Sequence, residues 1–288
     1  MHMQALKGSA GQVARVLTTT SPACRSGLFF WLIAIASLNS FAAIGVRTWA
    51  ERGPGYAIFE LSGISAIVWI ALAASLALLA SAGNQQPPSR TDWAVALLVV
   101  AASLIPIGTI SSIALTILAC YMLGSSRRDC ALSRSGIICL AITGSLIWGR
   151  VLLALFSRPL LDVDAWLVGT LFGSRQTGNV ISFVDGSGRI IVAPGCSSWQ
   201  GMSLAFVFWA TITQWYRVPL NWRSAGWCAL ALAATVAINV LRIGAMILFP
   251  EYIHEIHHGY GWHIFVWSTL IVVCTICVIG ARHEIFDS

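Results

Sequence analysis

The chain alternates long runs of apolar residues with short polar segments, and each long run is a candidate membrane-spanning helix. Crossing the hydrocarbon core of a bilayer takes about 20 apolar residues in helical form. The clearest runs cover residues 28–48, 57–83, 136–156, 199–215, 224–249 and 263–281. The pattern predicts an all-α integral membrane protein, a polytopic bundle in which residues 1–288 form one domain.

The apolar stretch 93–124 is too long for one span and short for two. Pro106 and Gly108 lie near its middle, which is typical of a tight turn. Arginines lie on both sides of the stretch, at Arg90 before it and at Arg127, Arg128 and Arg134 after it. Because arginine collects in cytoplasmic loops, an even number of spans should separate these clusters. Two short helices, 93–108 and 110–124, satisfy this and bring the total to about eight spans.

This count also predicts an orientation. Both chain ends then lie in the cytoplasm, including the polar N-terminal segment 1–27. The longest stretch between spans, residues 157–198, faces the outside. Arg47 and Arg52 fall on the outer side, against the general rule for arginine.

Composition supports a lipid environment and excludes other classes. The chain is 57% hydrophobic and 10% charged, whereas soluble domains carry about 25% charged residues. Its net charge of +6 comes from 16 arginines and a single lysine, Lys7. We assign this charge to membrane orientation, because no nucleic-acid-binding motif accompanies it. Most of the eight cysteines lie inside apolar runs, and Cys274 and Cys277 form a CxxC within the last span, where cysteine usually packs as a small hydrophobe.

The outer segment 157–198 contains two further predicted elements. Residues 160–173 have the pattern of an amphipathic helix lying on the membrane surface. Two β-prone runs, 179–184 and 189–193, flank a Gly-rich turn at 185–188, which predicts a small β-hairpin.

Cys196 follows this hairpin at a position that favours thiol reactivity. It comes after a Pro-Gly turn and just before the span 199–215, with Ser197 beside it. The positive end of a helix dipole favours a thiolate, and free backbone N–H groups at a helix start can donate to an oxyanion. We therefore expect Cys196 to act as a nucleophile.

Arg242 is a charged residue within the apolar run 224–249. A charge inside the membrane costs roughly 2.5–3.5 kcal/mol on insertion scales, so it must face a polar partner or cavity. Asn239 lies one turn earlier on the same helix face. Arg150, near the end of the span 136–156, either binds a substrate carboxylate or lipid phosphate, or extends to the membrane surface.

Four of the six histidines lie between residues 254 and 263, just before the last span. Histidine is the usual general base near neutral pH. His254 and His258 also have the i,i+4 spacing of metal ligands. No matching set of Cys, Asp or Glu accompanies them, so we expect no metal and no cofactor.

These residues occur in the order and spacing of three motifs of the exosortase/archaeosortase family, which the chain resembles. The first is Cys196-Ser197-Ser198, the second is Asn239-x-x-Arg242, and the third places His257 before Gly261-Trp262. The likeness is clear in the C-terminal half and rests on hydropathy alone elsewhere. Ser198 stands where the family usually has glycine.

The resemblance implies a membrane cysteine peptidase or transpeptidase with about eight helices, in the bacterial inner membrane with its site facing outward. It would remove C-terminal sorting signals, as in PEP-CTERM proteins, through a thioester. Cys196 would be the nucleophile, Arg242 the oxyanion stabiliser and His257 the base, with His254 or His258 as alternative bases. The partners would be lipid and a substrate protein that ends in a short motif, a transmembrane helix and a basic tail.

Two other functions fit the same residues. One is a metal-dependent intramembrane hydrolase that uses the histidines of 254–263. The other is a non-enzymatic component of exopolysaccharide or lipid export, in which Arg150 and Arg242 line a path for anionic groups.

Overall fold

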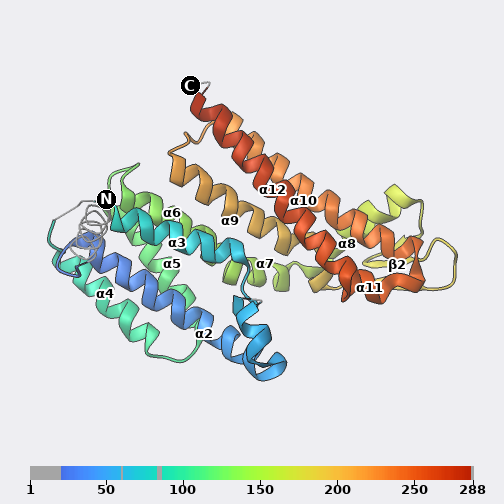
Figure 1. The fold of residues 1–288 in the computed structure, drawn as a ribbon, viewed down its shortest axis with the longest axis horizontal. Coiled ribbons are helices and arrows are strands. Elements are labelled where there is room, and N and C mark those ends of the chain that lie inside the picture. The colour runs from blue at the N-terminus through green and yellow to red at the C-terminus, as the bar shows by residue number, and fades with distance from the viewer. Residues whose placement is uncertain (1–20, 60, 83–85, 287–288) are drawn as a thin grey trace, which may run out of the picture. The chain divides into compact units, whose positions relative to one another are not determined.

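The computed structural model describes residues 21–59, 61–82 and 86–286 of the chain (Figure 1). Most of the predicted cytoplasmic segment 1–27 lies outside these residues. The chain divides into two compact units, residues 1–143 and 144–288. The single domain expected from the sequence stays a prediction.

Apolar helices account for the first unit. Its helices are α2 (Arg25–Phe59), α3 (Ala66–Ala80), α4 (Arg90–Ser103), α5 (Gly108–Ser125) and α6 (Ala131–Thr143), with a 3-10 turn, η1, at Leu61–Gly63. α2 packs against α3, α4 and α5, and α6 packs against α3 and α5. Hydroxyl pairs join some of these helices, as where the Oγ atoms of Ser75 in α3 and Ser135 in α6 lie 2.7 Å apart. Such interhelical hydrogen bonds stabilise bundles in lipid, where apolar contacts alone give little preference.

The span predicted at 57–83 is wrong at its start, because the corresponding helix α3 covers only Ala66–Ala80. The preceding helix α2 is interrupted at Gly53, whose φ of 84° is left-handed and suits glycine. The proline that follows disfavours helical geometry at Gly53. A new helix then starts where the Ser65 hydroxyl accepts a hydrogen bond from Ile67 N and caps α3.

The stretch 93–124 is divided into two helices. α4 ends at Ser103 and α5 begins at Gly108, with Pro106 in the turn between them. A side chain at Gly108 would lie 2.7 Å from the backbone oxygen of Ser40 in α2, so glycine permits the close approach of these two helices. A capping box between Ser89 and Asp92 begins α4.

The second unit contains the small sheet and the longest apolar helices. A π-helical turn, η2 (Gly144–Trp148), leads into α7 (Gly149–Leu155) and α8 (Ser157–Phe172). The remaining elements are β1 (Gln176–Thr177), β2 (Val180–Ser182), β3 (Arg189–Ile191), the 3-10 turn η3 (Pro194–Cys196), α9 (Ser198–Tyr216), α10 (Trp222–Leu248), the 3-10 turn η4 (Pro250–Tyr252), α11 (Ile253–His257) and α12 (Tyr260–Phe286). Within this unit α10 packs against α8, α9 and α12, and Figure 1 shows α12 running alongside α10.

The two β-prone runs of the sequence contain strands of a three-stranded sheet. β2 pairs antiparallel with β3 in a register that sets Ile181 opposite Ile190. A third strand, β1, which the sequence analysis missed, pairs antiparallel with β2 on its other side.

The described residues include five helices that are long and apolar enough to cross a membrane, as expected for an all-α, multi-pass membrane protein. They are Arg25–Glu51, Gly108–Ser125, Ala131–Leu155, Trp222–Leu248 and Tyr260–His283. α3 is apolar but shorter than these. α4 contains 14 residues and α9 contains 19. Neither is both long enough and apolar enough to be one of these candidate spans.

Candidate active site

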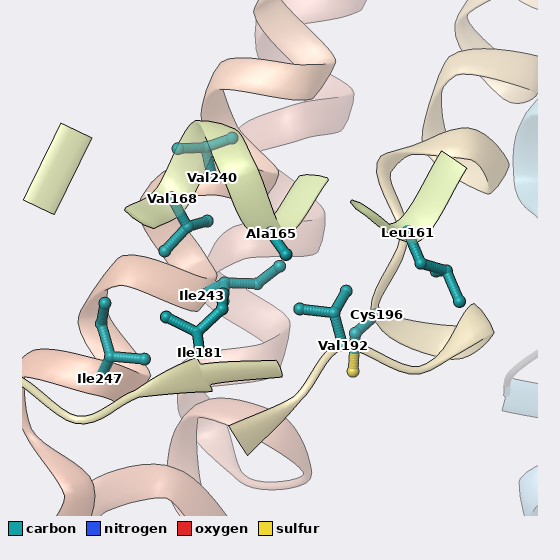
Figure 2. Close-up of a cluster of buried hydrophobic side chains, with 9 residues drawn as sticks. All are labelled: Leu161, Ala165, Val168, Ile181, Val192, Cys196, Val240, Ile243 and Ile247. Atoms are coloured by element: carbon teal, nitrogen blue, oxygen red, sulfur yellow. The ribbon is translucent and has the colours of Figure 1, made fainter. Parts of the chain in front are cut away.

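Cys196 lies where the strand β3 gives way to the helix α9. Its side chain is only 5% exposed and borders a buried cluster that joins α8, α10 and the sheet. In Figure 2 the sulfur of Cys196 points away from the other side chains of this cluster. The members of the cluster are Leu161, Ala165, Val168, Ile181, Val192, Cys196, Val240, Ile243 and Ile247. Apolar packing therefore fixes the cysteine backbone and leaves the sulfur at the edge of the cluster.

The imidazole of His257 contacts that sulfur. The Cys196 Sγ to His257 Nε2 distance is 3.0 Å, and the ring comes from α11, 61 positions further along the chain. A base within hydrogen-bonding reach of a thiol can take its proton directly. Among the three histidines that the sequence offered as bases, His257 is the one with a hydrogen bond to Cys196 among the described residues.

His258 contacts the other nitrogen of the His257 ring. His257 Nδ1 and His258 Nε2 are 2.9 Å apart, and which of them donates depends on the tautomer. When His257 Nε2 is unprotonated and can accept the thiol proton, Nδ1 carries the ring hydrogen. His257 Nδ1 then donates a hydrogen bond to His258 Nε2. His254 lies beyond, with its ring centroid 5.8 Å from that of His258.

Burial keeps His257 in the form that a base requires. Desolvation is the main cause that lowers the pKa of His257 below its usual 6.5, and electrostatic interactions with His258 and Arg242 lower that pKa further. A lowered pKa leaves the imidazole neutral near pH 7, so its Nε2 lone pair is available to Cys196.

The guanidinium of Arg242 lies against Cys196 from the side of α10. It is close enough to the Cys196 side chain to interact with it electrostatically. Its Nε is buried and has no hydrogen-bond partner among the described residues. Arg242 therefore brings a positive charge and an unused donor to the nucleophile.

Asn239 holds the same cysteine by its backbone. Its Nδ2 donates to Cys196 O at 2.9 Å. Because Asn239 and Arg242 are three residues apart on one helix, they share a face. One turn of α10 thus contacts both the carbonyl and the sulfur of Cys196.

The backbone N–H groups of residues 196–199 are not free to bind an oxyanion, as the sequence had suggested. Cys196 N donates to Ala193 O at 2.8 Å, and Ser197 N donates to Pro194 O at 3.3 Å. Ser198 N donates to Asp164 Oδ2 at 3.0 Å, and Trp199 N donates to Ser197 Oγ at 3.2 Å. The tight 3-10 turn and the helix cap use these donors internally, so the oxyanion donor that the described residues offer beside the sulfur is the side chain of Arg242.

Asp164 in α8 is a site residue that the sequence analysis missed. Its carboxylate is 2% exposed and accepts hydrogen bonds from Ser197 Oγ (2.8 Å), Ser198 N (3.0 Å) and Ser198 Oγ (2.6 Å). The available signal was a pair of acidic residues, Asp162 and Asp164, in an otherwise apolar segment, Leu160 to Gly169. Asp164 holds the start of α9, and Ser198 supplies two of the three donors that satisfy it.

Arg150 is separate from the other predicted site residues. Its side chain, in α7, is exposed, and no hydrogen bond or ion pair joins it to Cys196, His257 or Arg242 among the described residues. Its helix is nevertheless attached to the site, because Trp199 Nε1 donates to the neighbouring Gly149 O at 2.8 Å.

Two other expectations concern metals and cysteine pairs. Cys274 and Cys277 in α12 are free thiols. Within the described part of the chain, no three His, Cys, Asp or Glu side chains are grouped as a metal site. Compared with family models, with curated proteins and with solved structures, the chain matches none of them, so the function of this site has to be argued from its own geometry.

Proposed function

We propose that the chain is a membrane-embedded cysteine peptidase or transpeptidase that cleaves C-terminal sorting signals from exported proteins through a thioester. The observation that carries this proposal is the 3.0 Å contact between Cys196 Sγ and His257 Nε2. The Arg242 guanidinium beside the same sulfur supports it. A nucleophile, a base and a cation that converge from three separate elements are the parts that acyl transfer requires.

The first half of the reaction forms the thioester. His257 Nε2 takes the thiol proton while Cys196 Sγ attacks the carbonyl carbon of the scissile peptide bond. The C–S bond forms, and the carbonyl π electrons move to oxygen, where Arg242 donates to the oxyanion. When the intermediate collapses, the C–N bond breaks and His257 returns its proton to the leaving amine.

The second half resolves the thioester. A water molecule or an amine attacks the acyl carbon as His257 removes its proton, and the oxyanion again forms beside Arg242. Collapse breaks the C–S bond, and His257 reprotonates the sulfur. Water gives a free carboxylate, whereas an amine gives a new amide, which is the transpeptidase outcome.

The proposed substrate is a membrane protein that ends in a short motif, a transmembrane helix and a basic tail. A site at the end of apolar helices suits a bond next to such a helix. The proposed topology has about eight spans and both ends in the cytoplasm, with residues 157–198 outside the bacterial inner membrane. The arginines at 127, 128 and 134 support this orientation.

The test is processing of such a precursor in membranes. The chain is expressed with an epitope-tagged protein from the same source that ends in an apolar helix and an Arg-rich tail. We expect Cys196→Ala to leave the precursor at full length, while Cys274→Ala, the matched control in α12, processes it normally. Normal processing by Cys196→Ala would end the proposal, provided that both variants reach the membrane in equal amounts.

A further inference from the structure

The hydrogen bonds of the sheet show which N–H and C=O groups of β3 are bonded to β2. Val192 N donates to Asn179 O at 2.8 Å, and Phe183 N donates to Gly188 O at 2.9 Å. In an antiparallel pair, residues along one strand alternate between facing the partner and facing away. Residues 188, 190 and 192 therefore direct their N–H and C=O groups toward β2.

The two intervening residues, Arg189 and Ile191, direct their N–H and C=O groups to the open edge. The strand order β1-β2-β3 places no further strand beside them. Both side chains are exposed, that of Ile191 by 62%. No backbone hydrogen bond to these outward groups exists within the described part of the chain. An open edge of this kind is a template for another extended backbone.

The opposite edge of the sheet is the strand β1, which packs against a helix. β1 packs against α8, where Gly169 approaches the side chain of Gln176 closely. Of the two edges, β3 is the one that leads directly to Cys196.

β3 also runs directly to the nucleophile. Figure 2 shows the strand leading past Val192 to Cys196, five positions after Ile191. Val192 and Cys196 belong to the same buried cluster, and Asn179 Nδ2 donates to Val192 O at 3.0 Å. This packing gives the open edge a fixed position relative to the sulfur.

We infer that the open edge of β3 is the docking strand for an extended segment of the substrate polypeptide. The segment adds itself to the sheet as a further strand, bonded to the N–H and C=O groups of Ile191 and Arg189, and its scissile carbonyl reaches Cys196. Rows of backbone donors and acceptors at this spacing match an extended peptide chain. This inference rests on the proposed function, because it names how that site holds its substrate.

Proline at 191 tests the inference. Ile191→Pro removes an outward N–H and leaves the N–H groups that pair with β2 in place, which an edge strand tolerates. We expect the initial rate of precursor processing to fall about tenfold, as the loss of one hydrogen bond and a steric clash would predict. Ile191→Thr, which keeps the N–H, should process faster than Ile191→Pro, and Gln176→Pro, on the other edge, should process at nearly the wild-type rate.

The rate of Cys196 alkylation by iodoacetamide distinguishes a loss of substrate docking from a loss of thiol reactivity, because this small reagent needs no strand pairing. An unchanged alkylation rate in Ile191→Pro, together with slow processing, supports the inference. Wild-type processing by Ile191→Pro, in a series where Cys196→Ala is inactive, overturns it and leaves the proposed function standing. Processing by Cys196→Ala overturns the proposed function instead.

A photo-crosslinking measurement covers the case in which the proline variant does not fold. A benzophenone amino acid replaces Arg189, or Thr177 on β1 as control, in the Cys196→Ala chain. We expect light to link the precursor to position 189 and not to position 177. Equal linkage at both positions, absence of linkage at 189, or linkage of 189 only to a second copy of the chain overturns the inference.

Discussion

Arg242 shows at the scale of one residue why a costly charge belongs in an apolar helix. A charge in an apolar helix is unfavourable unless it faces a partner, and the Arg242 guanidinium faces Cys196. Because the backbone N–H groups of residues 196–199 are occupied, the buried Nε of Arg242, which has no hydrogen-bond partner among the described residues, is an available donor at this site. The residue is therefore expected to contribute to catalysis far more than to stability.

Arg242→Lys should abolish most of the activity although the charge is retained. An ammonium is a point charge that cannot present the planar, paired donors of a guanidinium. We expect kcat for precursor processing to fall about a hundredfold, the usual consequence of losing an oxyanion donor. Initial rates in membranes with equal amounts of protein measure this effect. A lysine variant with wild-type kcat would show that only the charge matters, and would remove Arg242 from its donor role.

The pH profile should report His257. Its pKa is lowered by burial first and by electrostatic interactions with His258 and Arg242 next. The neutral ring is the base, so activity should persist as pH falls below the ordinary histidine value of about 6.5, and be lost as pH falls through the lowered pKa. His258→Gln removes the electrostatic effect of His258, which raises the pKa of His257 and moves the acidic limb of kcat/KM to higher pH. An acidic limb that stays in place or moves downward contradicts this assignment.

The sequence pointed to the residues that meet at the candidate site but not to all of their partners. Cys196, Arg242 and the histidines stand out because each is a polar group at the edge of, or inside, an apolar run. Asp164 was missed because its donors lie 33 and 34 positions away, in a pairing that only the fold creates. The choice of His257 over its neighbours depends on the direction of one short helix, α11, which no sequence pattern determines.

At the scale of elements, the contact between α8 and the start of α9 holds the nucleophile in place. The carboxylate of Asp164 meets the N-terminal end of α9, where the helix dipole favours negative charge. It also satisfies the hydroxyls of Ser197 and Ser198. Ser198 stands where the family that the chain resembles usually has glycine, and it therefore has a structural role here.

Asp164→Ala should weaken this contact, and Ser198→Gly should partly restore it. Removing the carboxylate leaves two hydroxyls and one N–H without their acceptor, at about 1–3 kcal/mol for each buried group left unsatisfied. Glycine at 198 removes one of those hydroxyls, so the double variant should be more stable than additivity predicts. Thermal unfolding in detergent measures the stabilities, and the rate of Cys196 alkylation reports whether the turn is kept. Strictly additive losses would show that Asp164 and Ser198 do not act together.

The elements themselves were predictable to different degrees. Long apolar runs identified the helices, and Pro106 identified the break between α4 and α5. The end of α2 and the late start of α3 depend on the kink at Gly53 and the cap at Ser65, which hydropathy does not register. β1 escaped detection because two polar residues, Gln176 and Thr177, become a strand only through pairing with β2.

At the scale of the whole molecule, the arginines predict that the sheet and the connection between α5 and α6 lie on opposite sides of the membrane. Single cysteines in a chain whose own cysteines are replaced test this arrangement. Ser187→Cys lies in the exposed turn of the sheet, and Gly124→Cys lies at the exposed end of α5, where a side chain meets no atom within 4 Å.

We expect a membrane-impermeant maleimide to label position 187 in intact cells, and position 124 only after the membrane is permeabilised. The physical reason is that arginine-rich loops are retained on the cytoplasmic side, so Arg127, Arg128 and Arg134 should hold their loop inside. The proposed exported substrate can reach Cys196 only from the side that labels at 187, because these two positions flank the same short strand, β3. Labelling of 124 alone in intact cells would place the nucleophile in the cytoplasm, where exported proteins do not accumulate, and would require a different substrate for the same chemistry.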